Sequence, residues 1–315
     1  MRDLNHLDVS TPKPCIWAIG GGKGGVGKSV ITANMAMRLA QMGKRCVAMD
    51  VDLGGANLHT VIGMPSPDRT LSDFIQKKVD NLRDVMTPTP VPNLSIISGS
   101  KALMDMANPK HTQKEKMIRH LSLLDVDHIL LDLGSGSGFN ILDFFLIADE
   151  GILVILPEPT SVENAYHFIK AAFYRKLKRA TKRSGVAEAV DRAMEEKIAR
   201  GIQSPRMLIR NVLEIDPEAG MALQEEASLF RPNIIVNQVR RLDERDLGKD
   251  VAIACRDYFG IEVKFLGSID EDDCVRKAIK IKKPVLDAYP ASPFSQSIQS
   301  IVDNLFTRQE VRFGT

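Results

Sequence analysis

The strongest constraint on the fold is a glycine-rich segment near the N-terminus, where six of the eight residues from 20 to 27 are glycine. An apolar stretch, 16–19, precedes the segment, and an amphipathic stretch, 29–42, follows it. The amphipathic stretch places Ile31 and Met35 on one helical face. Glycine permits tight backbone curvature, at a cost in conformational entropy. The pattern therefore predicts a strand, a tight loop and a helix in succession.

Short apolar segments alternate with amphipathic segments along the rest of the chain. The further strands that we expect cover residues 45–49, 94–97, 128–131, 152–156, 234–236 and 263–266. The further helices that we expect cover residues 112–124, 139–148, 161–180, 243–259 and 272–281. Strands rich in Val, Ile and Leu that alternate with helices are typical of a parallel sheet covered on both faces. The sequence thus predicts an α/β fold with a doubly wound, mostly parallel sheet flanked by helices.

One long segment, 175–231, contains no expected strand. Helical patterns occupy 187–200 and 219–230 within it. We expect a single domain, 1–315, with 175–231 as a helical insertion and 1–14 as a flexible N-terminus. The insertion has two interpretations: a surface hairpin that covers the sheet, or a lobe that binds a partner.

Composition narrows the functional classes. The 42 basic and 40 acidic residues leave a formal net charge of only +2, so overall charge indicates no nucleic-acid partner. No apolar stretch approaches the roughly 20 residues that a membrane-spanning helix needs, and the N-terminus lacks the pattern of a signal peptide. The four cysteines include no Cys-x-x-Cys pair, which is typical of reduced thiols. We therefore expect a cytoplasmic protein.

The glycine-rich segment contains a phosphate-binding motif. Residues 22–29 read G-K-G-G-V-G-K-S and satisfy G-x-x-x-x-G-K-[ST] between an expected strand and an expected helix. Backbone N–H groups of such a loop surround phosphate oxygens, and the helix N-terminus adds a favourable dipole. We expect Lys28 to reach the β- and γ-phosphates and Ser29 to ligate Mg²⁺. The expected nucleotide-binding residues are Gly22, Gly24, Gly25, Val26, Gly27, Lys28 and Ser29.

Two other interpretations fit the same glycines. Overlapping G-x-G-x-x-G spacings within 20–27 match a dinucleotide fingerprint, and Asp50 lies where a ribose-binding carboxylate is expected. Lys28 and Ser29 have no role in a dinucleotide site, however, so the phosphate-binding loop is favoured. A glycine turn without a ligand is the third interpretation, and the entropy cost of the glycines argues against it.

Three carboxylates follow expected strands. Asp132 ends the segment 128–131, as the metal-side carboxylate of a nucleotide site does, and Gly136 follows at the spacing of a loop that senses the γ-phosphate. Asp50 and Asp52 share one side of an extended segment, because side chains alternate along a strand. Two carboxylates there suit Mg²⁺-bound water and an attacking water. A polar strand exit without function is the alternative.

With Lys23 included, the loop reads K-G-G-V-G-K-S and resembles the deviant Walker A motif of the MinD/ParA group of ATPases. Further segments resemble this group as a whole: 52–58, 234–239, 267–270, 275–278 and 283–285. The segment 157–161 is similar to MinD and, more closely, to the flagellar-number regulators (FlhG/FleN type). The segment 132–136, D-L-G-S-G, departs from the Ser-Pro-Ala core of MinD, and 175–231 is foreign to MinD. The N-terminus also lacks the activating segment that many flagellar-number regulators carry.

The resemblance implies a role for each site residue. Lys23 would reach the partner subunit's nucleotide across an ATP-dependent homodimer, and Asn237 would contact adenine. Asp52 would position the hydrolytic water, with Asp50 near Mg²⁺ and Asp132 holding Mg²⁺ through water. The implied cofactors are ATP and Mg²⁺. The implied catalytic residues are Lys23, Lys28 and Asp52.

The resemblance also implies a cellular role. We expect a slow ATPase, stimulated by an unknown protein partner, that acts as a spatial regulator of flagellar number or placement, of division sites, or of cargo. The first alternative is an ATPase for iron–sulfur cluster or metal delivery, and the lack of Cys-x-x-Cys argues against it. The second alternative is a scaffold that binds ATP without hydrolysing it.

Two surfaces bear on further partners. An apolar stripe near the C-terminus is formed by Phe294, Ile298, Ile301, Val302, Leu305 and Phe306. The polar side of this stripe lacks the lysines and arginines of a membrane-surface helix, which favours packing against the sheet over docking at the inner face of the membrane. The basic run 175–183 is typical of a solvated helix face, so we do not expect DNA binding.

Overall fold

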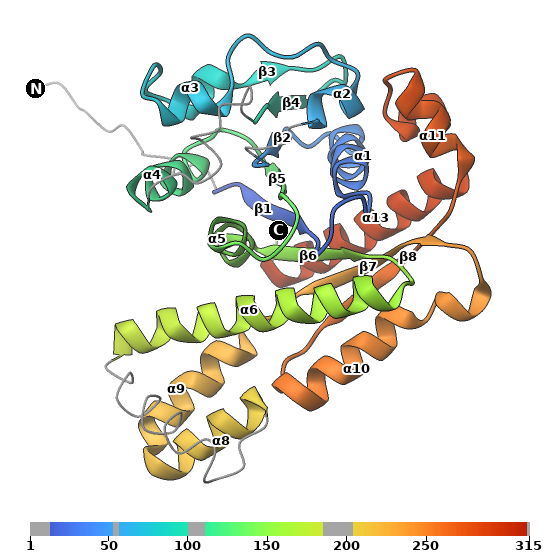
Figure 1. Cartoon of the computed structure of the whole chain (residues 1–315). Helices are drawn as coiled ribbons and strands as arrows, with labels where there is room; N and C mark the ends of the chain where they lie inside the picture. The colour runs from blue at the N-terminus through green and yellow to red at the C-terminus, as the bar shows by residue number, and fades with distance from the viewer. Residues whose placement is uncertain (1–12, 53–56, 100–110, 185–203, 314–315) are drawn as a thin grey trace, which may run out of the picture.

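Figure 1 shows the computed structural model of the chain. The structure describes residues 13–52, 57–99, 111–184 and 204–313. Residues 1–12 of the expected flexible N-terminus and the whole expected helix 187–200 lie outside the described residues.

An eight-stranded sheet forms the centre of the fold, in the order β3-β4-β2-β5-β1-β6-β7-β8. Neighbouring strands are parallel except β3 with β4. The strands are β1 (Cys15–Gly20), β2 (Cys46–Asp50), β3 (Thr87–Pro88), β4 (Leu94–Ile97), β5 (His128–Asp132), β6 (Glu150–Ile155), β7 (Asn233–Val239) and β8 (Lys264–Asp270). The chain builds the sheet on one side of β1 up to β5 and on the other side from β6 onward. Open parallel sheets bind ligands at such a switch point, beyond the carboxyl ends of the strands.

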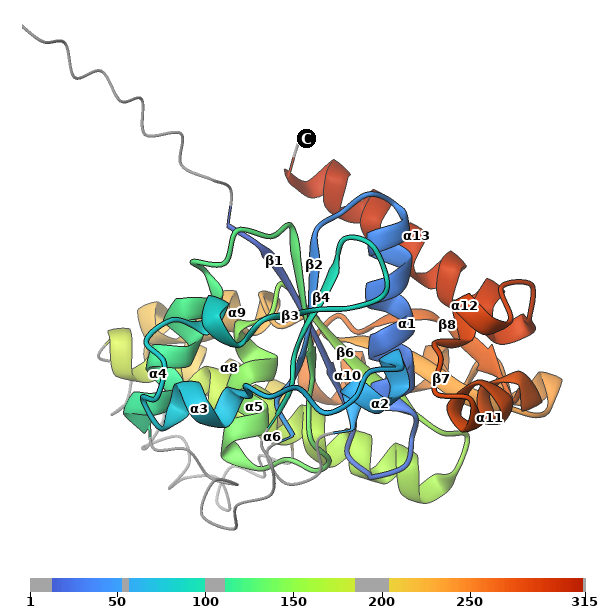
Figure 2. The same cartoon turned by 90° about the horizontal axis from the view of Figure 1, so that it is seen from above.

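Helices cover both faces of the sheet, as Figure 2 shows. One face packs against helices α3 (Leu71–Ile75), α4 (His111–Leu121), α5 (Phe139–Ile147), α6 (Pro159–Ser184), α8 (Pro205–Ile215), α9 (Pro217–Ser228) and α10 (Leu247–Phe259). The other face packs against α1 (Lys28–Gln41), α2 (Leu58–Ile62), α11 (Asp273–Lys280), α12 (Val285–Ala288) and α13 (Pro293–Phe313). Two short 3-10 helices, η1 (Leu82–Val85) and η3 (Leu242–Glu244), lie in connections. The doubly wound α/β prediction is confirmed.

The alternation of side chains along β1 explains the two hydrophobic cores. Ile16 and Ala18 lie in the core beneath α5 and α6, whereas Trp17 and Ile19 lie in the core beneath α1 and α13. Successive residues of a strand face opposite sides of a sheet, so a strand buried on both faces is continuously apolar. This is why 16–19 could be read as a central strand.

Several short elements were absent from the prediction. The two-residue strand β3 pairs antiparallel with β4 at the sheet edge, and α2, α3 and η1 form the connection between β2 and β4. The helix α8 also lacks a counterpart among the expected elements. The short helices carry too few side chains to establish a periodic pattern, and the two-residue strand β3 lacks the continuous apolar segment by which β2, β4 and β5 were predicted. The helix α8 has the pattern, and its start is marked by Ser204, whose hydroxyl accepts a hydrogen bond from the Met207 N–H.

The region between β6 and β7 contains α6, α8 and α9, and no strand among its described residues. The helix α6 starts at Pro159 and is continuous through the beginning of 175–231. Phe173 and Leu177 of α6 are buried in the core of the sheet, so the first turns of the proposed insertion belong to the layer that covers the sheet. That 175–231 is an insertion into a single domain remains a prediction.

The C-terminal helix α13 packs on α1 and β8. Its stripe residues Ile298 and Val302 are fully buried, and Arg38 on α1 donates two hydrogen bonds to the carboxylate of Asp303. The apolar stripe is therefore used in the core, as the packing interpretation predicted. Within the described residues, no helix is both long enough and apolar enough to cross a membrane.

Candidate nucleotide-binding site

The glycine-rich loop joins the carboxyl end of β1 to the N-terminus of α1. Gly25 and Gly27 have φ angles of 79° and 94°, in the left-handed region that favours glycine. A Cβ on Gly27 would lie 2.5 Å from Nδ2 of Asn237, and a Cβ on Gly22 would lie 2.4 Å from the carbonyl oxygen of Asn164. The glycines are thus required by backbone conformation and by close approach. This is the cradle geometry that phosphate-binding loops use.

Lys28, Ser29 and Asp132 come together at the base of the loop. The Lys28 side chain is largely buried, and its ammonium lies 3.5 Å from the carbonyl oxygen of Lys23. Burial lowers the pKa of Lys28, while the carboxylates of Asp132 and Asp52 oppose that shift. The lysine ammonium therefore lies within electrostatic range of two of the three expected carboxylates.

The carboxyl of Asp132 is buried and incompletely satisfied. Burial, with a contribution from the neighbouring Asp50 carboxylate, raises the pKa of Asp132 to about 8, against a hydrogen bond from Ser29. Its Oδ1 atom has no hydrogen-bond partner within the described part of the chain. A buried acceptor without a donor is costly, so it marks a position where a ligand would supply the missing interaction.

Asp50 and Asp52 lie beside Asp132 at the same sheet edge. Asp50 is the register partner of Asp132 on the adjacent strand β5. Its two carboxylate oxygens accept hydrogen bonds from the Asp52 N–H, at 3.0 Å, and from the Leu58 N–H, at 3.1 Å. Burial nevertheless raises the pKa of Asp50 to about 6. Asp50 therefore holds the backbone on both sides of the segment 53–56, which lies outside the described residues.

Asp52 faces the loop that follows β5. A Cβ on Gly134 would lie 3.4 Å from the carboxyl carbon of Asp52. The same loop is attached to the glycine-rich loop, because the Gly136 N–H donates to the carbonyl oxygen of Gly21 at 3.2 Å. Gly136 has a φ of 89°, which again favours glycine. The loop that was expected to sense the γ-phosphate is thus attached to the phosphate cradle, and the Asp52 carboxyl lies against it.

The side chain of Lys23, the other lysine of the loop, contacts a different partner from that of Lys28. Its ammonium lies 3.2 Å from Oε2 of Glu158, the residue before α6, and both side chains are about half exposed. Residues 157–161 were predicted to resemble a segment of the family, but no role was predicted for Glu158. An isolated glutamate in a loop carries no spacing signal, so only the folded structure identifies this contact.

Asn237 lies under the loop, near the end of β7. Its side-chain N–H donates to the carbonyl oxygen of Val26 at 2.8 Å. Asn237 therefore supports the loop directly. Its expected contact with adenine, through its other polar atoms, remains a prediction.

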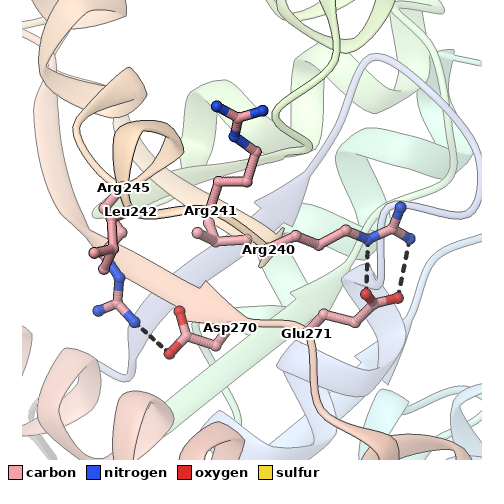
Figure 3. A pocket seen from close by; sticks show the side chains of 7 residues that line it. Arg240, Arg241, Leu242, Arg245, Asp270 and Glu271 are labelled. Atoms are coloured by element: carbon pink, nitrogen blue, oxygen red, sulfur yellow. Dashed lines mark hydrogen bonds and ion pairs between the residues drawn. The ribbon is translucent and has the colours of Figure 1, made fainter.

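A pocket of about 440 Å³ follows the carboxyl ends of β7 and β8 (Figure 3). Arg240 is paired with Glu271 through two hydrogen bonds of 2.7 and 3.0 Å, and Arg245 is paired with Asp270 at 2.5 Å. The sequence prediction assigned no role to any of these four charged residues, because ion pairs between distant segments leave no local pattern. The Glu158 carboxylate lies within electrostatic range of Arg240, which connects this pocket to the partner of Lys23.

The donor set fits a magnesium ion that retains water and phosphate ligands. Within the described residues, no three His, Cys, Asp or Glu side chains converge on one point. Mg²⁺ needs only one or two protein ligands when a nucleotide supplies others. The Ser29 hydroxyl and the unsatisfied Oδ1 of Asp132 are oxygen donors of the kind that Mg²⁺ prefers.

A parallel α/β sheet with this loop at its switch point defines a P-loop NTPase. The model of the ParA family, described as NUBPL iron-transfer P-loop NTPase, matches residues 14–194. The chain belongs to this family, within the MinD/ParA group of P-loop NTPases.

Similar proteins place the chain near the spatial regulators of this group. The antiactivator FleN of Pseudomonas aeruginosa is 25% identical over 291 residues, which cover 91% of this chain and 85% of FleN. The flagellum site-determining protein YlxH of Helicobacter pylori is 24% identical over 295 residues, which cover 93% of this chain and 82% of YlxH. The crystal structure of septum site-determining protein MinD from Pyrococcus horikoshii, complexed with Mg-ADP, has a TM-score of 0.64. The two chains are 22% identical, and the match covers 93% of this chain and 96% of the MinD chain. At this identity the likeness shows the fold alone.

Proposed function

We propose that this protein binds ATP with Mg²⁺ and hydrolyses the nucleotide slowly, as an ATP-gated homodimer. The observation that carries the proposal is the buried Asp132 carboxyl, whose Oδ1 lacks a partner beside Ser29 and Lys28. A phosphate cradle alone would support binding. A buried carboxyl with one oxygen that lacks a hydrogen-bond partner supports hydrolysis of the nucleotide as well.

Each residue of the cradle has a defined task in this proposal. The N–H groups of the 22–27 loop and the Lys28 ammonium bind the phosphates, and Ser29 and Asp132 hold Mg²⁺, with Asp50 close by. The bound cation, when present, neutralises charge on the phosphate oxygens. Asn237 and the pocket beyond the carboxyl ends of β7 and β8 receive the base.

Asp52 is the residue that we propose orients the attacking water. It is held at the cradle by its own backbone, through the hydrogen bond from its N–H to Asp50, and its side chain lies against Gly134. The Lys28 ammonium lies within electrostatic range of this carboxylate. Turnover is expected to be slow until an unknown protein partner completes the site, as it is in the family.

The ammonium of Lys23 is paired with Glu158 of its own subunit. We propose that it reaches the nucleotide of a second subunit when ATP is bound, and so joins the two chains through the γ-phosphate. Hydrolysis and phosphate release remove this link, which lets the dimer separate.

The cellular role that we propose is spatial regulation in the cytoplasm, of flagellar number or placement first and of division sites or cargo second. FleN is described as an antiactivator and YlxH as a flagellum site-determining protein, and both align over more than nine-tenths of this chain. The apolar side of α13 is buried in the core, so any association with the inner face of the membrane would need another surface. DNA binding is not proposed.

The family description favours one alternative, transfer of iron or of an iron–sulfur cluster. Thiolates are the cysteine form that binds metals. Burial raises the pKa of Cys46 to about 12 and that of Cys255 to about 11, which disfavours thiolates at these positions. Anaerobic reconstitution with iron and sulfide, followed by absorption spectroscopy, tests this alternative directly: a stable chromophore would support it over a spatial regulator.

The proposal is tested by sizing the protein with ATP·Mg²⁺ and with ADP. Asp52→Ala blocks hydrolysis, and Lys23→Ala is introduced in the same background. We expect a dimer with ATP but not with ADP, and no dimer in the Lys23→Ala variant. A monomer at saturating ATP would contradict the dimer proposal, even if nucleotide binding is intact.

Hydrolysis is tested separately by single-turnover release of phosphate. We expect slow release from the unmodified protein and none from Asp52→Ala. Equal, undetectable release from both proteins, with ATP binding retained, would favour the scaffold that binds ATP without hydrolysing it.

A further inference from the structure

The helix α6 is the longest helix in the described part of the chain, and it connects the phosphate loop with the helices α8 and α9 (Figure 1). We call α8 and α9 together the α8–α9 hairpin. The helix is continuous from Pro159 to Ser184, so at a rise of about 1.5 Å per residue it is about 39 Å long. Beyond its first residue it contains no glycine or proline, the residues at which helices usually kink. The two ends of α6 are therefore expected to move together.

The N-terminal end of α6 lies against the phosphate loop. A Cβ on Gly22 would lie only 2.4 Å from the carbonyl oxygen of Asn164, so the loop backbone and the helix are in close contact. The Lys23–Glu158 pair joins the same two segments at 3.2 Å. Segments packed this closely cannot shift independently, because no free space separates them. A change in the position of the phosphate loop therefore displaces the first turns of α6.

A second contact joins α6 to the loop 133–138, between β5 and α5, which contains Gly136 and was predicted to sense the γ-phosphate. The helix α5 begins directly after this loop. Asp143, one turn into α5, accepts two hydrogen bonds from Arg175, at 2.5 and 2.7 Å, and a further one from Arg179. Two arginines one turn apart on α6 thus hold one buried carboxylate of α5. A shift of the loop 133–138 is therefore also passed to α6.

The same part of α6 supports the α8–α9 hairpin. Lys176 pairs with Glu226 of α9 at 3.4 Å. The ring centroid of Phe173 lies 6.1 Å from that of Phe230, which follows α9. Phe173 and Lys176 lie on either side of Arg175 in the sequence, so α9 and the Asp143 carboxylate contact the same turn of α6. Both loops at the nucleotide site are thus connected to the base of the hairpin through one helix.

We infer that α6 transmits the state of the nucleotide site to the α8–α9 hairpin, so that the local stability of the hairpin depends on the bound nucleotide. The inference rests on the proposed ATP-gated function, in which the γ-phosphate repositions the loops that contact α5 and α6. Coupling between two sites is reciprocal, so any group that binds the hairpin and distinguishes its two arrangements changes the affinity for ATP. The proposed insertion then has a role beyond covering the sheet.

Hydrogen exchange of the Asp52→Ala protein, measured with ATP·Mg²⁺ and with ADP·Mg²⁺, tests the inference. We expect the amides of α9 to exchange about threefold more slowly with ATP, because loops held by the γ-phosphate restrain α6 and the hairpin. A response of the loop 133–138 without a response of α9 overturns the inference alone. No response in either segment overturns the inference together with the proposed ATP gating.

The variant Arg179→Gln tests the contact between α5 and α6. The Arg179 side chain is 44% exposed, and Asp143 remains paired with Arg175 and Lys114 in this variant. We expect ATP binding and the response of the loop 133–138 to be retained, and at least about half of the α9 response to be lost. Arg179→Lys should restore most of the α9 response, because a single hydrogen bond from a cation is sufficient to replace the contact.

The matched control is Arg210→Gln on α8. The Arg210 side chain is 82% exposed, and its pair with Glu214 lies within α8. This variant removes an arginine from the hairpin itself, and we expect the α9 response to remain complete. An α9 response that is equal in Arg179→Gln, Arg210→Gln and the parent protein would overturn the inferred connection through α6.

Discussion

The ammonium of Lys23 lies 3.2 Å from Oε2 of Glu158, so the loop lysine that is absent from ordinary P-loops is paired within its own subunit. The two side chains are 43% and 51% exposed. Exposed ion pairs contribute about 0–1 kcal/mol to stability, because water screens the charges and ordering two long side chains costs entropy. The proposed exchange of this partner for a phosphate in another subunit would therefore cost little.

The weakness of this pair is a testable prediction. Urea unfolding of the unmodified protein, Lys23→Ala, Glu158→Gln and the double variant gives the coupling free energy between the two side chains. We expect a coupling of about 1 kcal/mol or less, decreasing with added salt. A coupling above about 2 kcal/mol would instead make Lys23 a structural residue of the monomer.

The glycines of the phosphate loop should differ sharply in their tolerance of alanine. Gly24 has no left-handed φ, and its nearest neighbour to an added Cβ is 3.9 Å away. Gly25 has a φ of 79° and open space, so alanine there suffers backbone strain of roughly 1–2 kcal/mol. Gly27 combines a φ of 94° with a Cβ position 2.5 Å from Asn237, which adds about 1–3 kcal/mol of overpacking.

Thermal unfolding without nucleotide should therefore rank the variants Gly24→Ala, Gly25→Ala and Gly27→Ala in order of increasing destabilisation. Binding of a fluorescent ATP analogue should be lost in Gly27→Ala, because the loop must shift. Equal stability of all three variants would show that the loop adjusts freely, and the cradle described above would then not be rigid.

Much of the fold and of the phosphate site could be predicted from the sequence, because both depend on local patterns. The buried strands β1, β5 and β7 each contain a continuous apolar segment of three or four residues, as strands covered on both faces require. The loop glycines, Lys28 and Ser29 are adjacent in sequence, so one motif defines them. Asp132 was identifiable because it ends a buried strand.

The remaining features depend on contacts between distant segments. Glu158 reaches Lys23 across 135 residues of chain, and Asn237 reaches Val26 across 211. The expected adenine contact of Asn237 came from resemblance, and resemblance does not reveal that its N–H supports the loop. The Arg240–Glu271 pair, in the pocket beyond the carboxyl ends of β7 and β8, is likewise set by the pairing of β7 with β8, which a one-dimensional pattern does not encode.

Replacing Asp132 should separate stability from function. Its carboxyl is buried between Asp50 and Lys28, and Oδ1 has no partner, so it contributes little to the stability of the free protein. We expect Asp132→Asn to leave the melting temperature of the free protein unchanged or raise it, and to reduce Mg²⁺-dependent turnover about 100-fold or more. Calorimetry without nucleotide and phosphate release measure the two effects. A large loss of stability would show that Asp132 is structural.

A buried cluster around Asp143 should dominate the acid sensitivity of the fold. The carboxylate of Asp143 on α5 is 1% exposed and contacts Lys114 on α4 and Arg175 and Arg179 on α6. Burial alone would raise the pKa of Asp143, but hydrogen bonds from Arg175 and Lys114 outweigh burial and lower it. Removing one partner of a buried charge cluster costs about 3–5 kcal/mol. Asp143→Asn should destabilise the protein by this order at neutral pH.

The pH dependence of this effect has a definite sign. A carboxyl with a depressed folded-state pKa contributes stability that is fully present above its unfolded-state pKa, roughly 3.9, and is lost as pH falls through the folded-state value. The difference in melting temperature between the unmodified protein and Asp143→Asn should therefore be constant from pH 7 to about 5 and shrink below about 4. Asp125→Asn, at a half-exposed pair with Arg45, is the control and should change stability little. A difference that stays constant down to pH 3 would contradict this prediction, because the effect of Asp143→Asn would then not follow titration of the Asp143 carboxyl.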